Sequence, residues 1–298
     1  MTPSREGAIR NLRTGNTVIA LLLLGTLACR STAESQSGAD RSSQTGAAIN
    51  SDGLPRTSWD GKPDLSGVWG GPLPADGTST APERQKAGAA LKALYQPWAL
   101  ERTNSLKYTE DPRLHCAPYG FPRYMSIVAL TAPRKSFYFL FQIVQAPKQM
   151  AVLIEYMSSS FRVIHTDGSG HPAKITPTYF GDSRAHWEGD TLVVDATGFN
   201  GRTWLAGSLL TTGNVTAGMG DGGTMTSDAL HVIERWRLVD KDTLEYEATV
   251  EDPKVLTGAW TPPRYRVRRA APGTIINEAL CVAPEDLRVI RAAQEAKK

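Results

Sequence analysis

The residues best suited to chemistry lie in one short stretch, from Arg162 to Pro172. Within it, His165 and Asp167 are two positions apart, and residues so spaced on a strand point to the same face. The glycines that follow allow the chain to bring His171 back toward them. Such a group suits an acid-base dyad oriented by a carboxylate, or two imidazoles and an oxygen on a metal. A third interpretation is structural, with Asp167 capping an Asp-Gly turn at a strand end.

Glu234 is a further candidate, because it falls between Val232 and Trp236 on the side of a strand that the alternation predicts to be dry. A carboxylate there must be paired, hydrogen-bonded or protonated, since desolvating it alone costs several kcal/mol. Two interpretations stay open. Glu234 forms a structural ion pair with Arg123 or another arginine, or it converges with the two histidines and Asp167 in catalysis.

Aromatic residues offer walls for a ligand cavity, and an arginine and a histidine add polar contacts. Phosphate-cradling glycine motifs are absent, so no nucleotide cofactor is expected, and no third strong ligand for a metal is identifiable. The residues that we predict to bind a ligand are Arg162, His186, Trp187, Trp204, Trp236 and Trp260.

The segments that must position these residues are short apolar runs separated by turns, which is typical of strands. Loops too short for crossover helices predict antiparallel pairing. One helix is expected near the start of the domain, from Ala81 to Tyr95. The predicted strands are Ser126 to Leu130, Ser136 to Val144, Met150 to Tyr156, Phe161 to His165, Arg184 to Trp187, Thr191 to Thr197, Ala229 to Val239, Leu244 to Val250 and Arg264 to Arg268.

Three hairpins can be given a register. The first sets Glu155 opposite Arg162 and predicts an ion pair between them. The second turns at Gly189, in a positive-φ conformation. The third, with a three-residue loop from Lys241 to Thr243, separates a dry face from a wet one. Its dry face holds Val232, Trp236, Leu238, Leu244, Tyr246, Ala248 and Val250, and its wet face Arg235, Arg237, Glu245, Glu247 and Glu251.

The first residues have the order of a secretory signal: positive residues, an apolar run from Val18 to Leu24, then small residues. The run is too short to span a bilayer, which takes roughly 20 residues. Residues 25–29 resemble the lipobox of bacterial lipoproteins, which implies an acylated Cys29, and Arg30 by the same resemblance favours the outer membrane. Simple cleavage after Ala33 is the alternative. The polar stretch that follows predicts a flexible tether.

Two cysteines remain once Cys29 is acylated or removed. Cys116 and Cys281 are flanked by loop residues, and an even pair in an exported chain predicts a disulfide. Two unpaired buried cysteines are the alternative.

The charge balance gives no sign of a polyanionic partner, because the formal net charge is only +3. Arg264, Arg266 and Arg268 alternate with Tyr265 and Val267, as on a strand with one solvated face. We therefore expect no nucleic-acid partner.

Five segments together resemble a large family of exported bacterial proteins with no established activity. They are residues 63–69, 116–123, 162–171, 181–197 and 231–235, and Trp187-Glu-Gly-Asp-Thr-Leu-Val-Val194 is the most specific part. The family usually has Asp-Gly-Arg where this chain has Asp167-Gly168-Ser169. Leu65-Ser-Gly-Val-Trp69 also looks like the entry strand of lipocalin-like barrels, which implies a ligand cavity.

We therefore expect a mainly β fold: an antiparallel β-barrel or half-barrel, lipocalin-like, with one or two short peripheral helices. Residues 1–28 are expected to be a signal peptide, 29–57 a tether and 58–298 a single β domain. The expected function is binding of a small, partly apolar organic molecule by an exported, lipid-anchored protein that faces the periplasm and uses no cofactor. The alternatives are a cofactor-independent enzyme (isomerase, lyase or hydrolase) using His165, Asp167, His171 and Glu234, and a structural envelope lipoprotein.

Overall fold

The computed structural model describes residues 48–49, 53–71, 81–125, 140–155, 160–205, 223–279, 281, 288 and 295. These residues belong to one compact unit that runs from Thr45 to Lys298. Cys29, the expected signal peptide, most of the expected tether and the predicted strand Ser126 to Leu130 lie outside them. Within the described residues no helix is both long enough and apolar enough to cross a bilayer.

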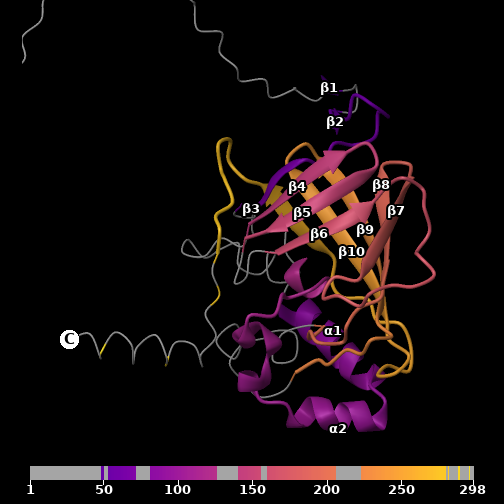
Figure 1. The fold of residues 1–298 in the computed structure, drawn as a ribbon, viewed down its shortest axis with the longest axis vertical. Helices are drawn as coiled ribbons and strands as arrows, with labels where there is room; N and C mark the ends of the chain where they lie inside the picture. Colours follow the sequence, from indigo (N-terminus) through magenta and orange to yellow (C-terminus); the bar gives the residue numbers. More distant parts are fainter. Residues whose placement is uncertain are drawn as a thin grey trace, which may run out of the picture. The chain divides into compact units, whose positions relative to one another are not determined.

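A closed barrel of nine strands forms the body of the molecule, so the predicted fold class is confirmed (Figure 1). Around the wall the order is β10-β11-β3-β4-β5-β6-β7-β8-β9, and β9 pairs with β10 to close it. A separate two-stranded sheet joins β1 (Ala48–Ile49) and β2 (Pro55–Arg56). The barrel strands are β3 (Gly67–Gly71), β4 (Phe141–Ala146), β5 (Gln149–Ile154), β6 (Ser160–His165), β7 (Asp182–Glu188), β8 (Thr191–Thr197), β9 (His231–Asp240), β10 (Thr243–Glu251) and β11 (Tyr265–Arg269).

One neighbouring pair in the wall departs from the expected antiparallel arrangement. β6 and β7 run parallel, and His165 pairs with Arg184. Parallel neighbours require a connection that returns along the wall, and residues 166–181 supply it. This long connection brings His171 to the outside of the barrel, against Asp195 of β8.

The alternation of side chains on β9 shows why the wall has a dry inside. Val232, Trp236 and Leu238 are buried, whereas the intervening Arg235 and Arg237 lie on the other face. On β10 the residues opposite them, Leu244, Tyr246 and Val250, are buried as well. The predicted dry face of the third hairpin is thus confirmed.

The two tight hairpins largely match their predictions. Glu188 pairs with Thr191 around Gly189, whose φ is +59°. In the third hairpin Asp240 pairs with Thr243, so two residues rather than three form the turn. A register shift after Thr243 then sets Leu244 opposite Leu238 and preserves the predicted faces.

The predicted register of the first hairpin is wrong. Arg162 lies opposite Val152, and Ile154 pairs with Ser160, so Glu155 is not across from Arg162. This register places Val152 and Ile154 in line with the inward-facing residues of β6, and burial of an apolar face fixes register strongly. The carboxylate of Glu155 instead accepts hydrogen bonds from the backbone and side-chain nitrogens of Asn277, at 3.0 and 2.8 Å.

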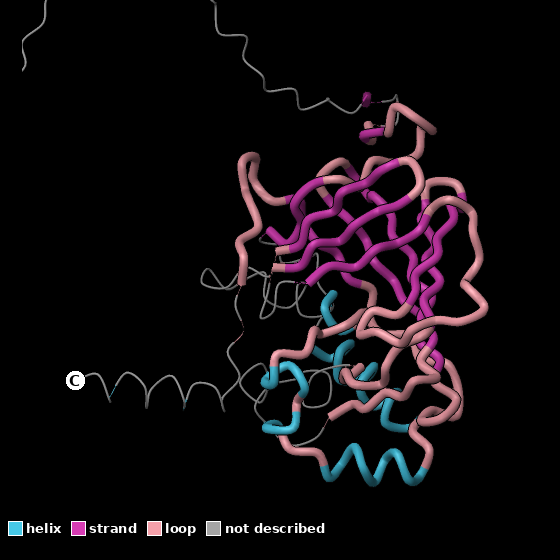
Figure 2. Tube along the Cα trace, in the orientation of Figure 1, coloured by secondary structure: helices cyan, strands magenta, loops and turns pink. Residues whose placement is uncertain are grey.

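Helices gather beyond one end of the barrel (Figures 1 and 2). α1 (Ala81–Leu94) confirms the predicted helix, and Pro82 lies in its first turn. The indole of Trp260 donates to the carbonyl of Ala87 in α1, at 3.0 Å. After α2 (Pro97–Ser105) come two 3-10 turns, η1 (Tyr108–Glu110) and η2 (Pro112–His115).

Residues 119–125, here called the plug, enter the barrel from this end. Phe121 lies 5.9 Å from Trp236 between ring centroids, and Tyr124 lies 6.2 Å from Phe141. Arg123 of the plug forms a buried ion pair with Asp111, at 2.5 Å. Burial alone would raise the pKa of Asp111, but the neighbouring guanidinium groups lower it below its ordinary value.

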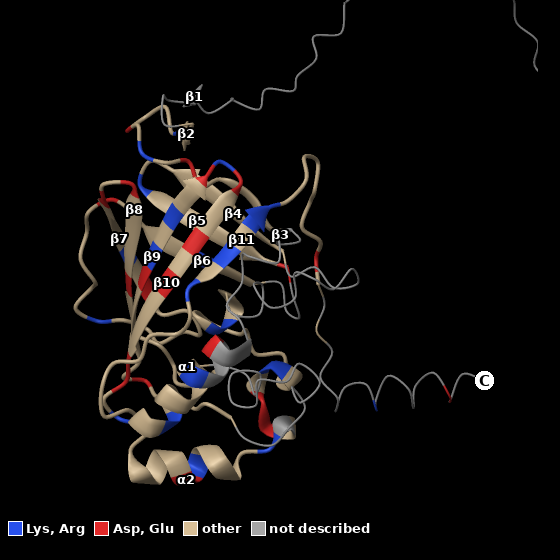
Figure 3. Ribbon diagram, turned by 180° about the vertical axis from the view of Figure 1, so that it is seen from behind, with Lys and Arg blue, Asp and Glu red and all other residues tan. Residues whose placement is uncertain are grey.

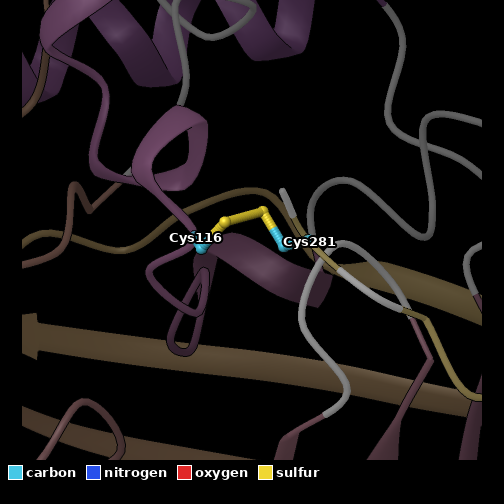
Figure 4. The surroundings of a disulfide bond; sticks show 2 residues. All are labelled: Cys116 and Cys281. Carbon is cyan, nitrogen blue, oxygen red and sulfur yellow. A yellow bond between two sulfur atoms is a disulfide. The ribbon is translucent and has the colours of Figure 1, made fainter. Parts of the chain in front are cut away.

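The predicted disulfide joins Cys116, at the end of η2, to Cys281 (Figure 4). Their Cα atoms are 5.5 Å apart, and the bridge spans 165 positions of sequence. It ties the residues that precede the plug to the chain that follows the last barrel strand.

The outer surface of the barrel is charged over some strands and apolar over others. Over β9, β10 and β11, arginines alternate with glutamates, and Figure 3 shows acidic and basic positions side by side on the wall. Glu245 accepts from both Arg237 and Arg266 there. Over β4 and β6 the outward side chains Val144, Phe161 and Val163 are apolar and exposed.

Candidate functional site

A buried charged cluster inside the barrel is the strongest candidate site. Arg162 of β6 donates through Nη1 to Glu234 Oε2 of β9, at 2.7 Å. The two side chains are 2% and 0% exposed, so the pair is shielded from water. The structural ion pair predicted for Glu234 is therefore present, with Arg162 rather than Arg123 as its partner.

Glu234 has further donors on both of its oxygens. The hydroxyl of Tyr246 donates to Oε1 at 2.9 Å, and the indole of Trp236 donates to Oε2 at 3.3 Å. Three donors therefore meet the two oxygens of this carboxylate. Burial raises the pKa of Tyr246 well above its ordinary value, and the adjacent carboxylate adds to that, so the phenol stays a donor.

Arg162 is held on three sides, but one of its nitrogens has no partner. Its Nε donates to Ser183 Oγ at 3.0 Å, and the ring of Phe121 covers the guanidinium at 4.8 Å from Cζ. Nη2 is buried and makes no hydrogen bond within the described part of the chain. An unsatisfied buried donor is costly and unusual, so this N–H needs an acceptor that the described residues do not supply.

The opposite mouth of the barrel has a depression with aromatic walls. It is lined by Trp59, Trp187 and Leu192 together with Thr166 and Gln145. Arg56 and Asp190 form an ion pair that ties the segment near Trp59 to the turn between β7 and β8. Of the predicted ligand-binding residues, Trp187 is the one found here.

The predicted ligand-binding residues do not share one cavity. Arg162 and Trp236 meet in the barrel interior, whereas Trp187 lies at the opposite mouth. Trp204 stacks on Arg123 of the plug, with Cζ 5.7 Å from its ring. Trp260 binds α1 through Ala87, and His186 is exposed on the outer surface near Glu188.

Asp167 acts as a turn cap, which is the structural interpretation of that stretch. Its Oδ1 accepts from the backbone N–H and the hydroxyl of Ser169, at 3.0 and 2.5 Å. The hydroxyl of Ser169 lowers the pKa of Asp167. His165, next along β6 from the buried Ile164, lies on the outer face and pairs with Gln149 and Arg184 in the sheet.

His171 does not return to these residues and instead joins a row of ionisable groups outside the barrel. Its Nδ1 lies 2.6 Å from Asp182 Oδ1, and its Nε2 lies 3.2 Å from Asp195 Oδ1. The same oxygen of Asp195 is 3.0 Å from Nε2 of His231. Nδ1 of His231 in turn lies 3.2 Å from Glu251 Oε2.

The four predicted catalytic residues therefore fall in different places. Glu234 points into the barrel, whereas Asp195, to which His171 binds, pairs with the neighbouring residue Ile233 and faces outward. Asp167 caps its own turn, and among the described residues His165 forms no hydrogen bond or ion pair with either cluster. Within the described residues, no three His, Cys, Asp or Glu side chains are grouped so as to hold a metal ion.

Sequence reasoning missed Ser183 and Phe121 in the interior cluster. Ser183 is nearly fully buried on β7, and alternation with Arg184 could have placed it on the inner face. Phe121 lies outside any periodic element, so no spacing pattern marks it. Tyr246 was placed on the dry face but not linked to Glu234.

Comparisons with protein-family models, with curated proteins and with solved structures found no match.

Proposed function

We propose that this protein binds a small, uncharged organic molecule inside its barrel, at Arg162. The observation that carries the proposal is the buried Nη2 of Arg162, which has no acceptor among the residues that the structure describes. A ligand oxygen or nitrogen at this position would satisfy the donor. The ring of Phe121 beside the guanidinium, and the ring of Trp236 that contacts Phe121, would pack against the apolar part of the ligand.

The charge balance of the cluster favours an uncharged ligand over an anion. Arg162 and Glu234 already neutralise each other, and the carboxylate oxygens are occupied by three donors. A carboxylate ligand would add an uncompensated buried charge, which costs several kcal/mol. A carbonyl, ether or hydroxyl oxygen accepts the free N–H without that cost.

We also propose that the protein is exported and anchored through a lipid on Cys29. The disulfide between Cys116 and Cys281 supports export, since structural disulfides persist in oxidising compartments. Intact mass measurement tests the anchor. A diacylated or triacylated chain that begins at Cys29 is expected, and a chain that begins at Glu34 would contradict it.

Ligand identification from protein purified from its native cells tests the binding proposal. Small molecules released from the wild type and from Arg162→Lys are compared by untargeted mass spectrometry. Lysine keeps the positive charge beside Glu234 but lacks the planar array of donors, so the variant is expected to lose the molecule.

The matched control is Arg235→Lys, which changes an exposed arginine on the outer wall and is expected to retain the molecule. Thermal melting of all three proteins confirms that they are folded. Recovery of no molecule from the wild type, or equal recovery from Arg162→Lys, would refute the proposal.

A further inference from the structure

Ser183 places a second buried hydrogen-bond donor beside Arg162. Its side chain lies on the inner face of β7 and is 1% exposed. Within the described residues its hydroxyl makes one hydrogen bond, which it accepts from Nε of Arg162 at 3.0 Å. A hydroxyl is also a donor, and its proton has no acceptor among these residues. Leaving such a buried donor unsatisfied costs free energy, as it does for Nη2 of Arg162.

The planar guanidinium directs one N–H of Nη2 toward the same place. In an arginine side chain, Nε and Nη2 lie on one edge of the group, and their N–H bonds on that edge are nearly parallel. Because the Nε–H bond points at Ser183 Oγ, an N–H bond of Nη2 runs alongside it. Nη1, on the other edge, donates to Glu234. The two unsatisfied donors, Nη2 and Ser183 Oγ, can therefore converge on one acceptor atom.

The acceptor that fits both donors is an oxygen with two available lone pairs and no proton. A carbonyl oxygen has two lone pairs in its own plane and a single substituent, so both donors can reach it. An ether oxygen carries two carbon substituents, and both must fit beside the ring of Phe121, which covers the guanidinium. A hydroxyl brings a proton that needs a further acceptor, and an aromatic ring nitrogen has only one lone pair.

Short side chains line the wall beside these donors. On the inner face of β7 the next residue after Ser183 is Ala185, and the partner of Ser183 on β8 is Ala196. Both alanines are buried. Bulky aromatic residues stand instead on β9 and β10, as Trp236 and Tyr246. The β7–β8 side of the interior is thus the side on which a molecule bound to Ser183 meets small side chains.

We propose that Arg162 and Ser183 together recognise a carbonyl oxygen, so that the ligand of the barrel is an uncharged carbonyl compound such as a ketone, an ester or an amide. The assignment rests on the proposed binding at Arg162 and names its ligand class. Ser183 is the residue that determines this specificity, because Nη2 by itself can donate to any single acceptor.

Nuclear magnetic resonance of the purified, dialysed protein tests the assignment with three probes of similar size: acetone, propan-2-ol and dimethyl ether. The proton signals of Nε and Nη2 of Arg162 report binding at this position, and Arg162→Lys identifies them by their loss. Acetone is expected to bind about ten-fold more tightly than the other two probes, because it alone satisfies both donors without adding a proton or a second substituent.

Ser183→Ala is expected to weaken acetone binding about ten-fold, since one of two hydrogen bonds to the carbonyl is lost. Ser58→Ala, which changes an exposed serine outside the barrel interior, is the control and should bind acetone as the wild type does. Two results would overturn the carbonyl assignment alone: another probe that binds as tightly as acetone, or unchanged acetone binding in Ser183→Ala. If no probe moves the Arg162 signals, the proposed binding at Arg162 is overturned as well.

Discussion

At the scale of single residues, the main feature of the barrel interior is the ion pair of Arg162 and Glu234, which is shielded from water. Each alone would be strongly unfavourable in the barrel, and their mutual contact with Ser183, Trp236 and Tyr246 offsets most of that cost. One nitrogen of Arg162, Nη2, is buried and has no acceptor among the described residues.

Glu234→Gln is expected to lower the free energy of unfolding by about 3 to 5 kcal/mol, because it leaves Arg162 charged and unpaired. Combining it with Arg162→Met removes the orphaned charge, so the double variant is expected to be more stable than Glu234→Gln alone. Urea denaturation gives the free energy of unfolding of the wild type, of Glu234→Gln and of the double variant. Glu247→Gln, on the outer wall beside Arg264, is the matched control and should cost about 1 kcal/mol or less.

At the scale of elements, local patterns predicted the barrel strands within the described residues and the turn at Gly189, whereas the turn between β9 and β10 is one residue shorter than predicted. The alternation on β9 and β10 was enough to place Glu234 inside, and Gly189 was enough to fix its turn. The register of β5 and β6 was not predictable from the turn length, because burial of the inner face decided it.

One contact in each cluster escaped the sequence because it joins segments that are not paired neighbours in the sheet. Arg162 and Glu234 are not on neighbouring strands, and they meet across the interior. His171 contacts Asp195 because the connection 166–181 passes over the outside of β7 and β8. No periodic pattern in the sequence predicts either of these two contacts.

Two glycines that flank β7, one at each end of the strand, should respond differently to alanine. Gly181 and Gly189 both have positive φ, +67° and +59°. A Cβ on Gly189 meets nothing within 4 Å, whereas one on Gly181 would lie 2.3 Å from the carbonyl oxygen of Thr197. Gly189→Ala is expected to cost about 1 to 2 kcal/mol from backbone strain alone.

Gly181→Ala should be clearly more destabilising than Gly189→Ala in the same urea titration, since the backbone of β8 must also move. Equal losses for the two variants would show that the close approach of Gly181 to Thr197 is not a constraint on the fold.

At the scale of the whole molecule, one covalent bond links chain regions on either side of eight of the nine barrel strands. Replacing Cys116 and Cys281 by alanine is expected to lower the free energy of unfolding by about 5 kcal/mol, through the entropy regained by the unfolded chain. Denaturation with and without reductant measures this. A reductant that leaves the midpoint of the wild type unchanged would contradict a stabilising role.

We propose that Nη2 of Arg162, which has no acceptor among the described residues, donates to an uncharged ligand inside the barrel. A high-resolution crystal structure of the protein purified from its native cells tests it most directly. The account predicts an organic molecule whose acceptor atom lies about 2.9 Å from Nη2 of Arg162. A single water in that place, or a protein group bonded to Nη2, would contradict it.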